Sequence, residues 1–528
     1  MKSSILSLVS ASLAAFVAGH GISVSPNASG LLTVKTPTGK YAGFIDPVFP
    51  RTRQFRSIAF AQPPVKSLRW EAPQKLPPSD QVHNAYDLPP SCPQFISRTP
   101  SFSSEFFPGG AMIYNGDQNH TSGLVGTDTS EDCLYLAIWT PTNATSSSKL
   151  PVLFFMTGGG FQGGGVNLPY QLPMDWVERS QSHIVITINY RVNIFGFPNA
   201  RGASEQNLGI LDQRTALEWV RDNIANFGGD PAAITQWGQS AGSMSADIHA
   251  HAYYDDPIAR AYILQSGTVF SGAANPANTF LNFSFVAQHF GCNSTSTNGT
   301  AELACMKAVP FQQITNFVGQ YGDSGATPAL SFQPQVDERI VFSDYPARIA
   351  AGKVARLPTI LSTTANEGST LVPYTPTGIS QDIILQVTLS GFVCPTFNST
   401  VERNHLDIPI YRYQQGGQYP NLNPLNWTGA YHGSDIPLNF GTVNLVTTWG
   451  NATQLTIDTS RAMQQHILAF AKDPLNGPEE LGWKRFNSSA PNGGELIRFG
   501  ADGKVAQYVD GIEIDGVCQG LGGYNAFP

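Results

Sequence analysis

The segment Thr235–Ser245 contains the pentad GQSAG, Gly238–Gly242, which has the form G-x-S-x-G. An apolar stretch at 232–234 precedes it, and the helix-compatible stretch Met244–Ala252 follows it. A pentad in this context predicts a nucleophile elbow, in which a strand turns sharply into a helix and presents a serine at the carboxyl end of a sheet. Such a tight turn brings neighbouring backbone too close for a Cβ atom, so it needs glycine. The pentad therefore makes Ser240 a candidate nucleophile, with a chance match in a Gly/Ser loop as the alternative.

The apolar segments around the pentad predict an α/β fold with a central, mostly parallel sheet and helices on both faces. Six runs lack strict alternation, as expected of strands that are buried on both faces. A helix is expected over Leu211–Phe227, because the apolar residues recur at helical spacing and Gly-Gly-Asp-Pro follows. Pro/Gly-rich stretches at 80–130, 270–330 and 370–430 indicate long insertions into one domain. The six runs are Pro151–Met156, His183–Val192, Ala233–Trp237, Ala261–Gln265, Leu357–Ser362 and Ile408–Tyr413.

The N-terminus and the charge content indicate an extracellular protein. Lys2 precedes the apolar run Ile5–Val17, and two small residues follow, which is the pattern of a signal peptide. We place its cleavage near Gly19, so that residues 1–19 are removed and residues 20–528 form a single catalytic domain. No later segment has 18 consecutive apolar residues, and no transmembrane anchor is expected. Charged residues make up 13 % of the chain, the net charge is −8 and no Lys/Arg cluster stands out, which excludes nucleic acid as an expected partner.

Sequons and cysteines fit the same compartment. Ten N-x-[ST] sequons predict surface loops with glycans on some of them. Six cysteines predict three disulfides, and their order suggests the pairs 92–133, 292–305 and 394–518 among fifteen possible pairings. Their spacing matches no zinc template. The cysteines are Cys92, Cys133, Cys292, Cys305, Cys394 and Cys518. The sequons begin at Asn27, Asn119, Asn143, Asn282, Asn293, Asn298, Asn398, Asn426, Asn451 and Asn487.

A second glycine-rich segment, Thr157–Phe161, follows the strand expected at Pro151–Met156. Glycines after a strand leave backbone N–H groups open, which suits them to a developing negative charge. A phosphate cradle is the rival interpretation, but the segment lacks G-K-[ST] and no G-x-G-x-x-G opens a helix here. The segment therefore predicts oxyanion donors, with a plain flexible loop as the remaining alternative.

From roughly Thr33 to the C-terminus, the chain resembles the type-B carboxylesterase/lipase family of α/β-hydrolases, which includes cholinesterases and Candida-type fungal lipases. The resemblance implies the α/β-hydrolase fold and a serine esterase that needs neither a metal nor an organic cofactor, as in secreted fungal members. It also agrees with the cysteine order: the first pair would bracket a lid-like loop and the last would tie in the C-terminal region. The motifs that carry it are SEDCLYLAIWTP at 130–141, GGGF at 158–161, NYRVNIFGF at 189–197, NLGILDQRTALEWVRDNIANFGGDP at 207–231, GQSAG at 238–242, ANEGS at 365–369 and YHGSDIP at 431–437.

The resemblance also selects the partners of Ser240. It implies Glu367 as the acid and His432, in a glycine-flanked loop, as the base, in the chain order that α/β-hydrolases use. By the same correspondence, the oxyanion donors are the N–H groups of Gly159, Gly160 and Ala241. Thr157 departs from the family, whose members usually carry an aromatic residue or histidine there, so the stiffness of the loop is in question. Among the rival titratable residues, we expect structural roles for Asp212, Asp435 and His466. His405 lies in a polar turn, and His249 and His251 are two positions apart, so on a helix they cannot share a face as metal ligands.

Two further departures concern the substrate. Gln239 precedes the serine where cholinesterases and many fungal lipases have glutamate, and no tryptophan lies between Cys92 and Cys133, where cholinesterases place one. A quaternary ammonium site needs aromatic faces and negative charge, so choline esters are not expected to be preferred. The loop between these cysteines is apolar, and its side chains either pack onto the body or form a mobile lid or gorge wall. These side chains are Phe95, Ile96, Phe102, Phe106, Phe107, Met112 and Ile113.

Together these features predict a secreted carboxylic-ester hydrolase that works through an acyl-enzyme on neutral, moderately hydrophobic small-molecule esters. Lipase or sterol esterase action on long acyl chains is one alternative, and acyl transfer or ester formation is another. A catalytically inert binding protein on the same fold is the rival from a different class. No cofactor is implied, and the oligomeric state is left open.

Overall fold

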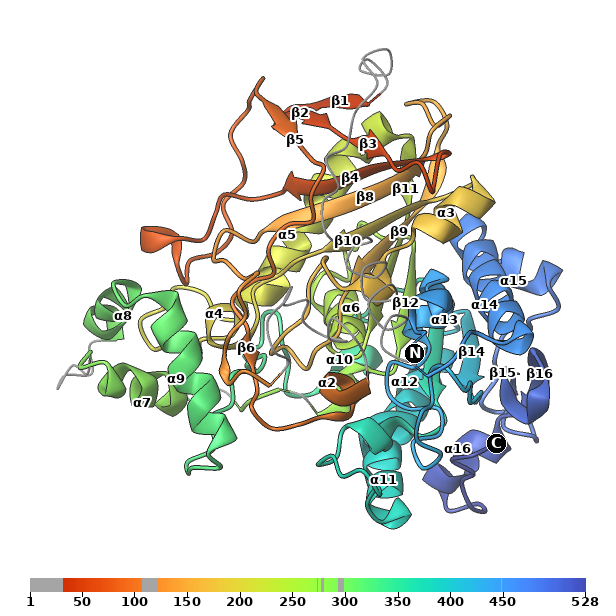
Figure 1. Ribbon diagram of the computed structural model, residues 1–528. Helices are drawn as coiled ribbons and strands as arrows, with labels where there is room; N and C mark the ends of the chain where they lie inside the picture. Colours follow the sequence, from red (N-terminus) through yellow and green to blue (C-terminus); the bar gives the residue numbers. More distant parts are fainter. Residues whose placement is uncertain (1–31, 107–120, 273, 277–279, 293–298, 448) are drawn as a thin grey trace, which may run out of the picture.

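An open, twisted sheet of eleven strands runs through the middle of the molecule (Figure 1). The computed structural model describes residues 32–106, 121–272, 274–276, 280–292, 299–447 and 449–528, and the predicted signal peptide lies outside this part of the chain. From one edge to the other, the strands are β16 (Ala506–Asp510), β15 (Glu495–Phe499), β14 (Ile410–Gln415), β13 (Thr359–Thr364), β12 (Ala261–Gln265), β11 (Gly229–Gln239), β9 (Leu150–Met156), β10 (Ile184–Ile188), β8 (Tyr135–Pro141), β4 (Thr52–Ala59) and β3 (Phe44–Ile45).

The central strands are parallel and the edges are antiparallel. Strands β10, β9, β11, β12, β13, β14 and β15 pair in parallel, whereas β8, β4 and β3 on one side and β16 on the other pair antiparallel. All six predicted strands are present, as β9 to β14, so the predicted mostly parallel sheet is confirmed. Two small sheets accompany it, one made of β1 (Thr33–Thr36), β2 (Gly39–Ala42) and β5 (Val82–Asn84), the other of β6 (Phe95–Ile96) and β7 (Leu124–Val125).

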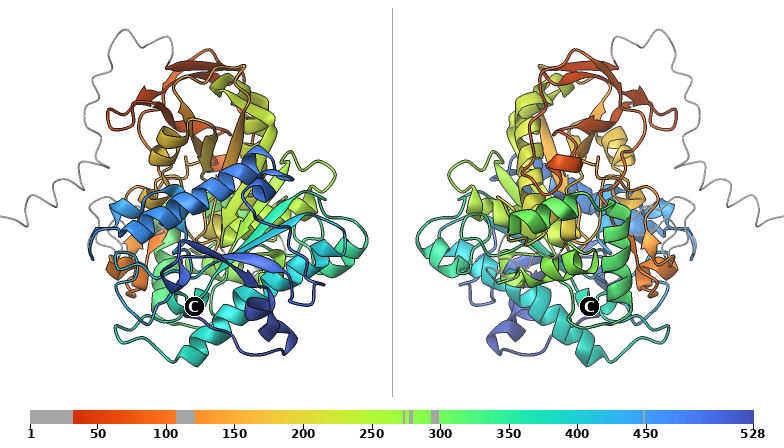
Figure 2. Two further views of the ribbon diagram at one scale, coloured as in Figure 1. Left: turned by 90° about the vertical axis from the view of Figure 1, so that its right-hand side faces the viewer. Right: turned by 90° about the vertical axis from the view of Figure 1, so that its left-hand side faces the viewer.

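Helices cover both faces of the sheet (Figure 2). Helices α5 (Leu208–Asn223) and α6 (Ala241–Ala252) lie on one face, and α3 (Met174–Ser180), α13 (Ile436–Phe440) and α14 (Gln454–Lys472) lie on the other. Strand β9 shows why its sequence is apolar throughout. Val152, Phe154 and Met156 belong to the core under α5 and α6, whereas Leu153 and Phe155 belong to the core under α3, α13 and α14. Because both faces are buried, both sets of alternating side chains must be apolar.

Two of the stretches expected as long insertions contain helices. Residues 270–330 include α7 (Leu281–His289), α8 (Gly299–Lys307) and α9 (Phe311–Asp323), and residues 370–430 include α11 (Gln381–Thr388) and α12 (Cys394–Asn404). Helices α7, α8 and α9 bury Phe283, Met306 and Ile314 in a core of their own with Trp70 and Phe195. Their apolar residues therefore face one another away from the sheet, in segments whose Gly, Pro and Asn content conceals the helical period.

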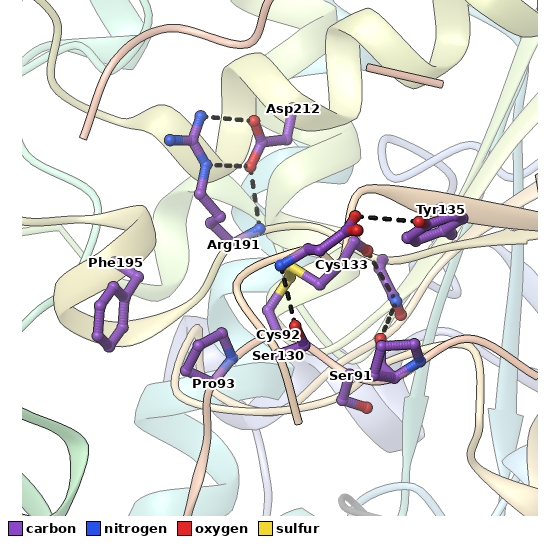
Figure 3. The surroundings of a disulfide bond; sticks show 12 residues. Ser91, Cys92, Pro93, Ser130, Cys133, Tyr135, Arg191, Phe195 and Asp212 are labelled. Atoms are coloured by element: carbon purple, nitrogen blue, oxygen red, sulfur yellow. Dashed lines mark hydrogen bonds and ion pairs between the residues drawn. A yellow bond between two sulfur atoms is a disulfide. The ribbon is translucent and has the colours of Figure 1, made fainter. Parts of the chain in front are cut away.

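Three disulfides join the pairs that the cysteine order suggests, Cys92–Cys133, Cys292–Cys305 and Cys394–Cys518. The first of them, Cys92–Cys133, lies close to the residue pair Arg191 and Asp212 (Figure 3). Asn189, directly after β10, donates from its Nδ2 to the carbonyl oxygens of Pro90 (2.8 Å) and Cys133 (2.9 Å). The base of the 92–133 loop is therefore held to the carboxyl edge of the central sheet both covalently and by hydrogen bonds.

Three buried histidines predict that the fold loses stability in acid. Burial lowers the pKa of His183 and His249 to about 3 and that of His251 to about 4. A histidine in the unfolded chain has a pKa of about 6.5. Below that pH, these histidines bind protons in the unfolded chain but stay neutral in the folded one. The stabilising contribution of each neutral histidine is therefore complete above pH 6.5 and is lost as the pH falls.

We expect His251→Gln to make the free energy of unfolding less dependent on pH. Between pH 7.5 and pH 5.0, the His251 contribution corresponds to about 2 kcal/mol, at about 1.4 kcal/mol per pKa unit. Urea unfolding at the two pH values measures this difference, whatever the variant does to stability at either pH alone. His405→Gln, on the exposed turn after α12, is the control and should keep the wild-type difference. An unchanged difference in His251→Gln would contradict the assignment.

Candidate active site

Ser240 occupies a strained turn between β11 and α6. Its backbone has φ 57° and ψ −124°, a conformation that a residue with a Cβ rarely adopts. The Ser240 N–H donates to the Gln265 carbonyl oxygen (2.8 Å), and the Met244 N–H donates to the Ser240 carbonyl oxygen (2.9 Å). Contacts to the neighbouring strand and to the following helix therefore hold the strain, as is common at functional sites.

The two outer glycines of the pentad are required by close backbone contacts. A Cβ on Gly238 would lie 2.1 Å from the Gly242 carbonyl oxygen, and a Cβ on Gly242 would lie 2.0 Å from the Met156 carbonyl oxygen. Both distances are far inside van der Waals contact. The pentad is thus a strand–turn–helix elbow, as its sequence context predicts.

Glu367 and His432 reach the same edge of the sheet from neighbouring strands. Ser240 follows β11, Glu367 lies three residues beyond β13, and His432 lies in the turn 432–435 that comes after β14. Because β11 to β14 are parallel, their carboxyl ends lie together, although the three residues are 65 or more positions apart in the chain. The His432 Nδ1 lies 2.6 Å from Glu367 Oε2.

The Glu367 carboxylate is completely buried and fully hydrogen-bonded. Its Oε1 accepts from the Ser266 hydroxyl (2.6 Å) and from the Thr364 N–H (2.7 Å), while Oε2 faces His432. These donors fix the orientation of the carboxylate, so that its Oε2 accepts a hydrogen bond from the protonated Nδ1 of His432. The Nε2 of His432 is then the acceptor of the neutral ring.

Sequence reasoning missed Ser266. It follows β12 directly, at the same edge where Ser240 follows β11. The rule that functional side chains gather at the carboxyl ends of parallel strands would have drawn attention to it.

Ser240 and His432 line one cavity of about 360 Å³. In this cavity, the His432 Nε2 lies 3.2 Å from the Gln239 side-chain nitrogen, so the Gln239 amide donates a hydrogen bond to that Nε2 atom. Within the part of the chain that the structure describes, the Ser240 hydroxyl makes no hydrogen bond. Catalytic hydrogen bonds are often absent or long before substrate binds, so this arrangement suits a resting site.

The glycine loop after β9 presents unpaired backbone donors beside Ser240. The N–H groups of Gly159, Gly160 and Ala241 donate no hydrogen bond to any residue that the structure describes. Gly159 has φ +121°, and a Cβ there would lie 2.3 Å from the Gly163 carbonyl oxygen, so only glycine fits. Ala241 is the first residue of α6, where N–H groups have no partner within the helix.

The loop is held at several points in spite of Thr157. Tyr190 donates from its hydroxyl to the Thr157 carbonyl oxygen (2.8 Å), and the Gln333 side chain donates to the Gly160 carbonyl oxygen (3.0 Å). Gln94, in the disulfide loop, exchanges two hydrogen bonds with the backbone of Gly164. Contacts with neighbouring segments therefore hold the glycine loop in place, although position 157 carries threonine and not the residue that is usual in the family.

The two rival carboxylates have structural surroundings. Asp212 makes a paired contact with the Arg191 guanidinium at 2.7 and 2.8 Å, near the first disulfide (Figure 3). Asp435 is buried behind His432, with Oδ2 3.5 Å from the Tyr413 hydroxyl. Burial, and then the nearby charge of Glu367, raise the pKa of the Asp435 carboxyl to about 7. Neither carboxylate lines the cavity that contains Ser240 and His432.

The rival histidines also lie away from the cavity. His249 and His251 are buried on α6, and His249 contacts the Gln236 side chain at 2.8 Å. His466 lies 2.7 Å, through its Nδ1, from the Ala462 carbonyl oxygen of its own helix. His405 is exposed in the turn after α12.

The described part of the 92–133 loop packs onto the body and also borders the cavity. Phe102, in α2 (Phe102–Phe106), is buried 4.8 Å from the Tyr431 ring, and Phe106 contacts Tyr374 and Trp449. Phe95 and Ile96 form β6, which contacts α9. Ser103 lines the cavity. Phe107, Met112 and Ile113 lie outside the described residues.

The sequons divide into three groups. Asn27, Asn119, Asn293 and Asn298 lie outside the described residues. Asn282 is half-buried and donates to the Ser331 carbonyl oxygen (2.8 Å). The remaining five are exposed, and glycosylation there stays a prediction: Asn143, Asn398, Asn426, Asn451 and Asn487.

A serine elbow at the carboxyl edge of an open, mostly parallel sheet, facing a histidine that is bound to a buried carboxylate, defines the α/β-hydrolase class. Within this class the chain belongs to the carboxylesterase family, whose sequence profile matches residues 31–387. The protein is therefore a carboxylic-ester hydrolase, and the predicted family, fold and enzyme class are confirmed.

Comparison with characterised relatives supports this family assignment. The chain is 39 % identical to Chlorogenic acid esterase of Aspergillus niger, over 96 % of this chain and 99 % of that one. It is 34 % identical to Secreted lipase 5 of Gibberella zeae, over 92 % and 94 %. It is 26 % identical to Acetylcholinesterase of Bungarus fasciatus, over 89 % and 83 %. Among the described residues, no helix is long and apolar enough to cross a membrane.

Proposed function

We propose that the protein is a secreted esterase in which Ser240 is the nucleophile, His432 the base and Glu367 the residue that orients the base. The observation that carries this proposal is the meeting of Ser240 and His432 in one cavity, with the His432 Nδ1 2.6 Å from a buried, fully hydrogen-bonded carboxylate. Secretion is supported by the three disulfides, by the predicted signal peptide at residues 1–19 and by a relative that is named as a secreted lipase.

The reaction has two halves. The Ser240 hydroxyl attacks the ester carbonyl carbon and gives its proton to the His432 Nε2. The N–H groups of Gly159, Gly160 and Ala241 then donate to the oxygen that becomes negative, and the imidazolium returns the proton to the departing alcohol. In the second half, His432 takes a proton from water, the resulting hydroxide attacks the acyl-enzyme, and the acid leaves as Ser240 regains its proton.

The walls of the cavity support neutral, moderately hydrophobic esters as substrates. Tyr170, Leu371, Phe392 and Tyr431 supply apolar surface, and no carboxylate is among the described residues that line it. Its volume of about 360 Å³ suits a small ester. The name of one relative, Chlorogenic acid esterase, makes chlorogenic acid one candidate substrate for this chain, and the name of the other, Secreted lipase 5, makes esters with longer acyl chains the second candidate.

Hydrolysis of 4-nitrophenyl esters from C2 to C16, with and without a lipid interface, tests the substrate class. Each buried CH₂ contributes about 0.8 kcal/mol, so kcat/KM should rise about fourfold per carbon until the site is full. A maximum at short or medium chains without activation by the interface supports the esterase. A maximum at C16 that depends on the interface would make the protein a lipase.

We expect the enzyme to prefer a neutral ester to a choline ester of the same shape. Gln239 is uncharged, whereas cholinesterases have a glutamate at this position. Without a negative charge nearby, removing a quaternary ammonium group from water costs free energy that no attraction offsets. For 3,3-dimethylbutyl butyrate and butyrylcholine, we expect kcat/KM to favour the neutral ester by about 10-fold. Gln239→Glu should reduce this ratio. A wild-type preference for the cation would show that another part of the cavity supplies a cation site.

A further inference from the structure

We propose that Tyr524 is a positioning residue that holds Glu367 and His432 in their places relative to one another. The inference rests on the proposed function, because it takes these two residues as the base and the residue that orients it. Three observations lead to it: hydrogen bonds at the tyrosine hydroxyl whose direction is fixed, one peptide group that connects the two residues' segments, and a second aromatic side chain beside that connection.

Tyr524 lies in the segment 520–528, which follows the 3-10 turn Gly516–Gln519. The disulfide Cys394–Cys518 holds the start of this segment. The Tyr524 side chain is partly buried against the hydrophobic core, and its hydroxyl contacts residues at the carboxyl ends of β13 and β14. The segment therefore reaches the same edge of the sheet as the residues of the active site.

An arginine fixes the direction of the hydrogen bonds at Tyr524. The Arg498 Nε donates to the Gln414 Oε1 (2.9 Å), and a guanidinium can only donate. The Gln414 Nε2 therefore faces the tyrosine and donates to its Oη (3.0 Å). The one proton of the hydroxyl is then left for the Ala365 carbonyl oxygen, 2.9 Å away. Burial, and then the nearby charge of Glu367, raise the pKa of Tyr524 above its ordinary value, so the hydroxyl keeps this proton.

The peptide group between Ala365 and Asn366 connects the segments that carry Glu367 and His432. Its oxygen accepts from the tyrosine hydroxyl, and its N–H donates to the Ala430 carbonyl oxygen (2.8 Å). These two carbonyl groups belong to residues two positions before Glu367 and two positions before His432. Because hydrogen bonds in a chain polarise one another, the bond at the oxygen strengthens the bond that the N–H donates.

A second aromatic side chain of the segment lies beside the same connection. Phe527 contacts Gly429, where a Cβ would lie 3.1 Å from the phenylalanine Cε1 and 3.1 Å from the Asn366 Cβ. The Asn366 Nδ2 also donates to the Thr428 carbonyl oxygen (2.9 Å). The loop before the histidine therefore touches both Asn366 and Phe527.

Tyr524 thus acts on the reaction through other residues. It is not among the described residues that line the cavity of Ser240 and His432. Loss of its hydroxyl should loosen the placement of Glu367 relative to the imidazole, which slows the proton transfers and leaves substrate binding unchanged. We therefore expect kcat and kcat/KM to fall together.

The test is Tyr524→Phe, which removes the hydroxyl and keeps the ring. On ethyl butyrate, kcat should fall by about 5- to 20-fold, and KM should stay within about twofold of wild type. Tyr411→Phe is the matched control, because the Tyr411 hydroxyl also donates to a carbonyl oxygen, that of Leu475 (2.9 Å), but lies at the amino end of β14. This control should keep wild-type kcat. Urea unfolding of each variant measures whether it is folded.

A double-mutant cycle shows whether Tyr524 acts through Glu367. In Glu367→Gln the orientation of the imidazole is already disturbed, so adding Tyr524→Phe should change the remaining kcat on 4-nitrophenyl butyrate by less than about twofold. A tyrosine that only stabilised the fold would lower the free energy of unfolding and leave kcat unchanged in both backgrounds.

Phe527→Leu tests the same connection at a second position. The side chain is 38 % exposed, so the fold should tolerate the change. We expect kcat to fall by about threefold at constant KM, because part of an aromatic contact is lost. Leu521→Ala, in the same segment and 50 % exposed, is the control and should keep wild-type kcat.

The outcomes separate this inference from the proposed function. The role of Tyr524 is overturned if Tyr524→Phe keeps kcat within twofold of wild type, if it raises KM instead, or if it lowers kcat equally in the Glu367→Gln background. If Tyr524→Phe does not fold, Phe527→Leu decides by the same three criteria. A wild-type kcat in Glu367→Gln itself would overturn the proposed function, and the inference with it.

Discussion

Replacing Ser240 with alanine is expected to lower kcat by about 10⁶-fold. When the members of a catalytic triad act as a unit, loss of the nucleophile removes nearly all of the acceleration they supply together. The remaining rate should exceed the uncatalysed one by about 10³- to 10⁴-fold, because the donors of Gly159, Gly160 and Ala241 are backbone groups that the substitution leaves in place. Turnover of 4-nitrophenyl butyrate and of ethyl butyrate measures the loss.

Ser243 provides the matched control for this substitution. It is buried in the first turn of α6, and its hydroxyl donates to the Gly267 carbonyl oxygen (2.6 Å). Ser243→Ala should retain kcat within about 10-fold of wild type, since it removes a structural hydrogen bond of about 1 kcal/mol. An organophosphonate should label the wild type at Ser240 alone. Covalent labelling of another serine, or substantial turnover by Ser240→Ala, would refute the assignment of the nucleophile.

Loss of His432 should cost about as much as loss of Ser240, and Glu367→Gln should lower kcat by about 10⁴-fold. Alanine at position 432 leaves no base for the serine proton. Glutamine at position 367 keeps the shape, but it has one carbonyl oxygen where the carboxylate accepts from Ser266 and Thr364 on one oxygen and faces His432 with the other. Its NH₂ group must therefore oppose a donor or face Nδ1, which displaces the imidazole or favours its wrong tautomer.

The same substrates and the same kcat measurement test this pair of residues. His405→Gln, on the exposed turn after α12, is the control and should keep wild-type turnover. Ser266→Ala should fall between the control and Glu367→Gln, because one of the donors to Glu367 remains. Near wild-type turnover by His432→Ala would exclude it as the base. A loss in Glu367→Gln no larger than that in Ser266→Ala would show that the carboxylate only supports the fold.

The central sheet could be predicted because strands that are buried on both faces have continuous apolar sequences. Strand β9 must be apolar at every position from Val152 to Met156, since alternate side chains enter different cores. The antiparallel edge strand β16 could not be found in this way: it is largely exposed, and its Ala506–Asp510 sequence is mixed. The helices α7, α8 and α9 were missed for a related reason, because they bury their apolar side chains against one another and not against the sheet.

Residue types and local spacing by themselves determined the elbow. Gly238 and Gly242 approach backbone atoms that lie within a few residues of Ser240 or on the adjacent strand β9. These contacts require glycine at fixed positions, which is why the pentad can be recognised in the sequence. The partners of Ser240 are a different matter. Glu367 and His432 were selected among many carboxylates and histidines by family resemblance, since no local pattern states that residues 127 and 192 positions away share an edge.

Only the tertiary structure decided how these groups face one another and what surrounds them. The parallel order of β11, β12, β13 and β14 brings Ser240, Ser266, Glu367 and His432 to one edge and places Gln239 against the imidazole. The physical reason is that local sequence governs contacts within a turn or along a strand, through sterics and burial. Contacts between distant segments depend on the pairing order of the strands and on the course of the loops between them, which no single segment encodes.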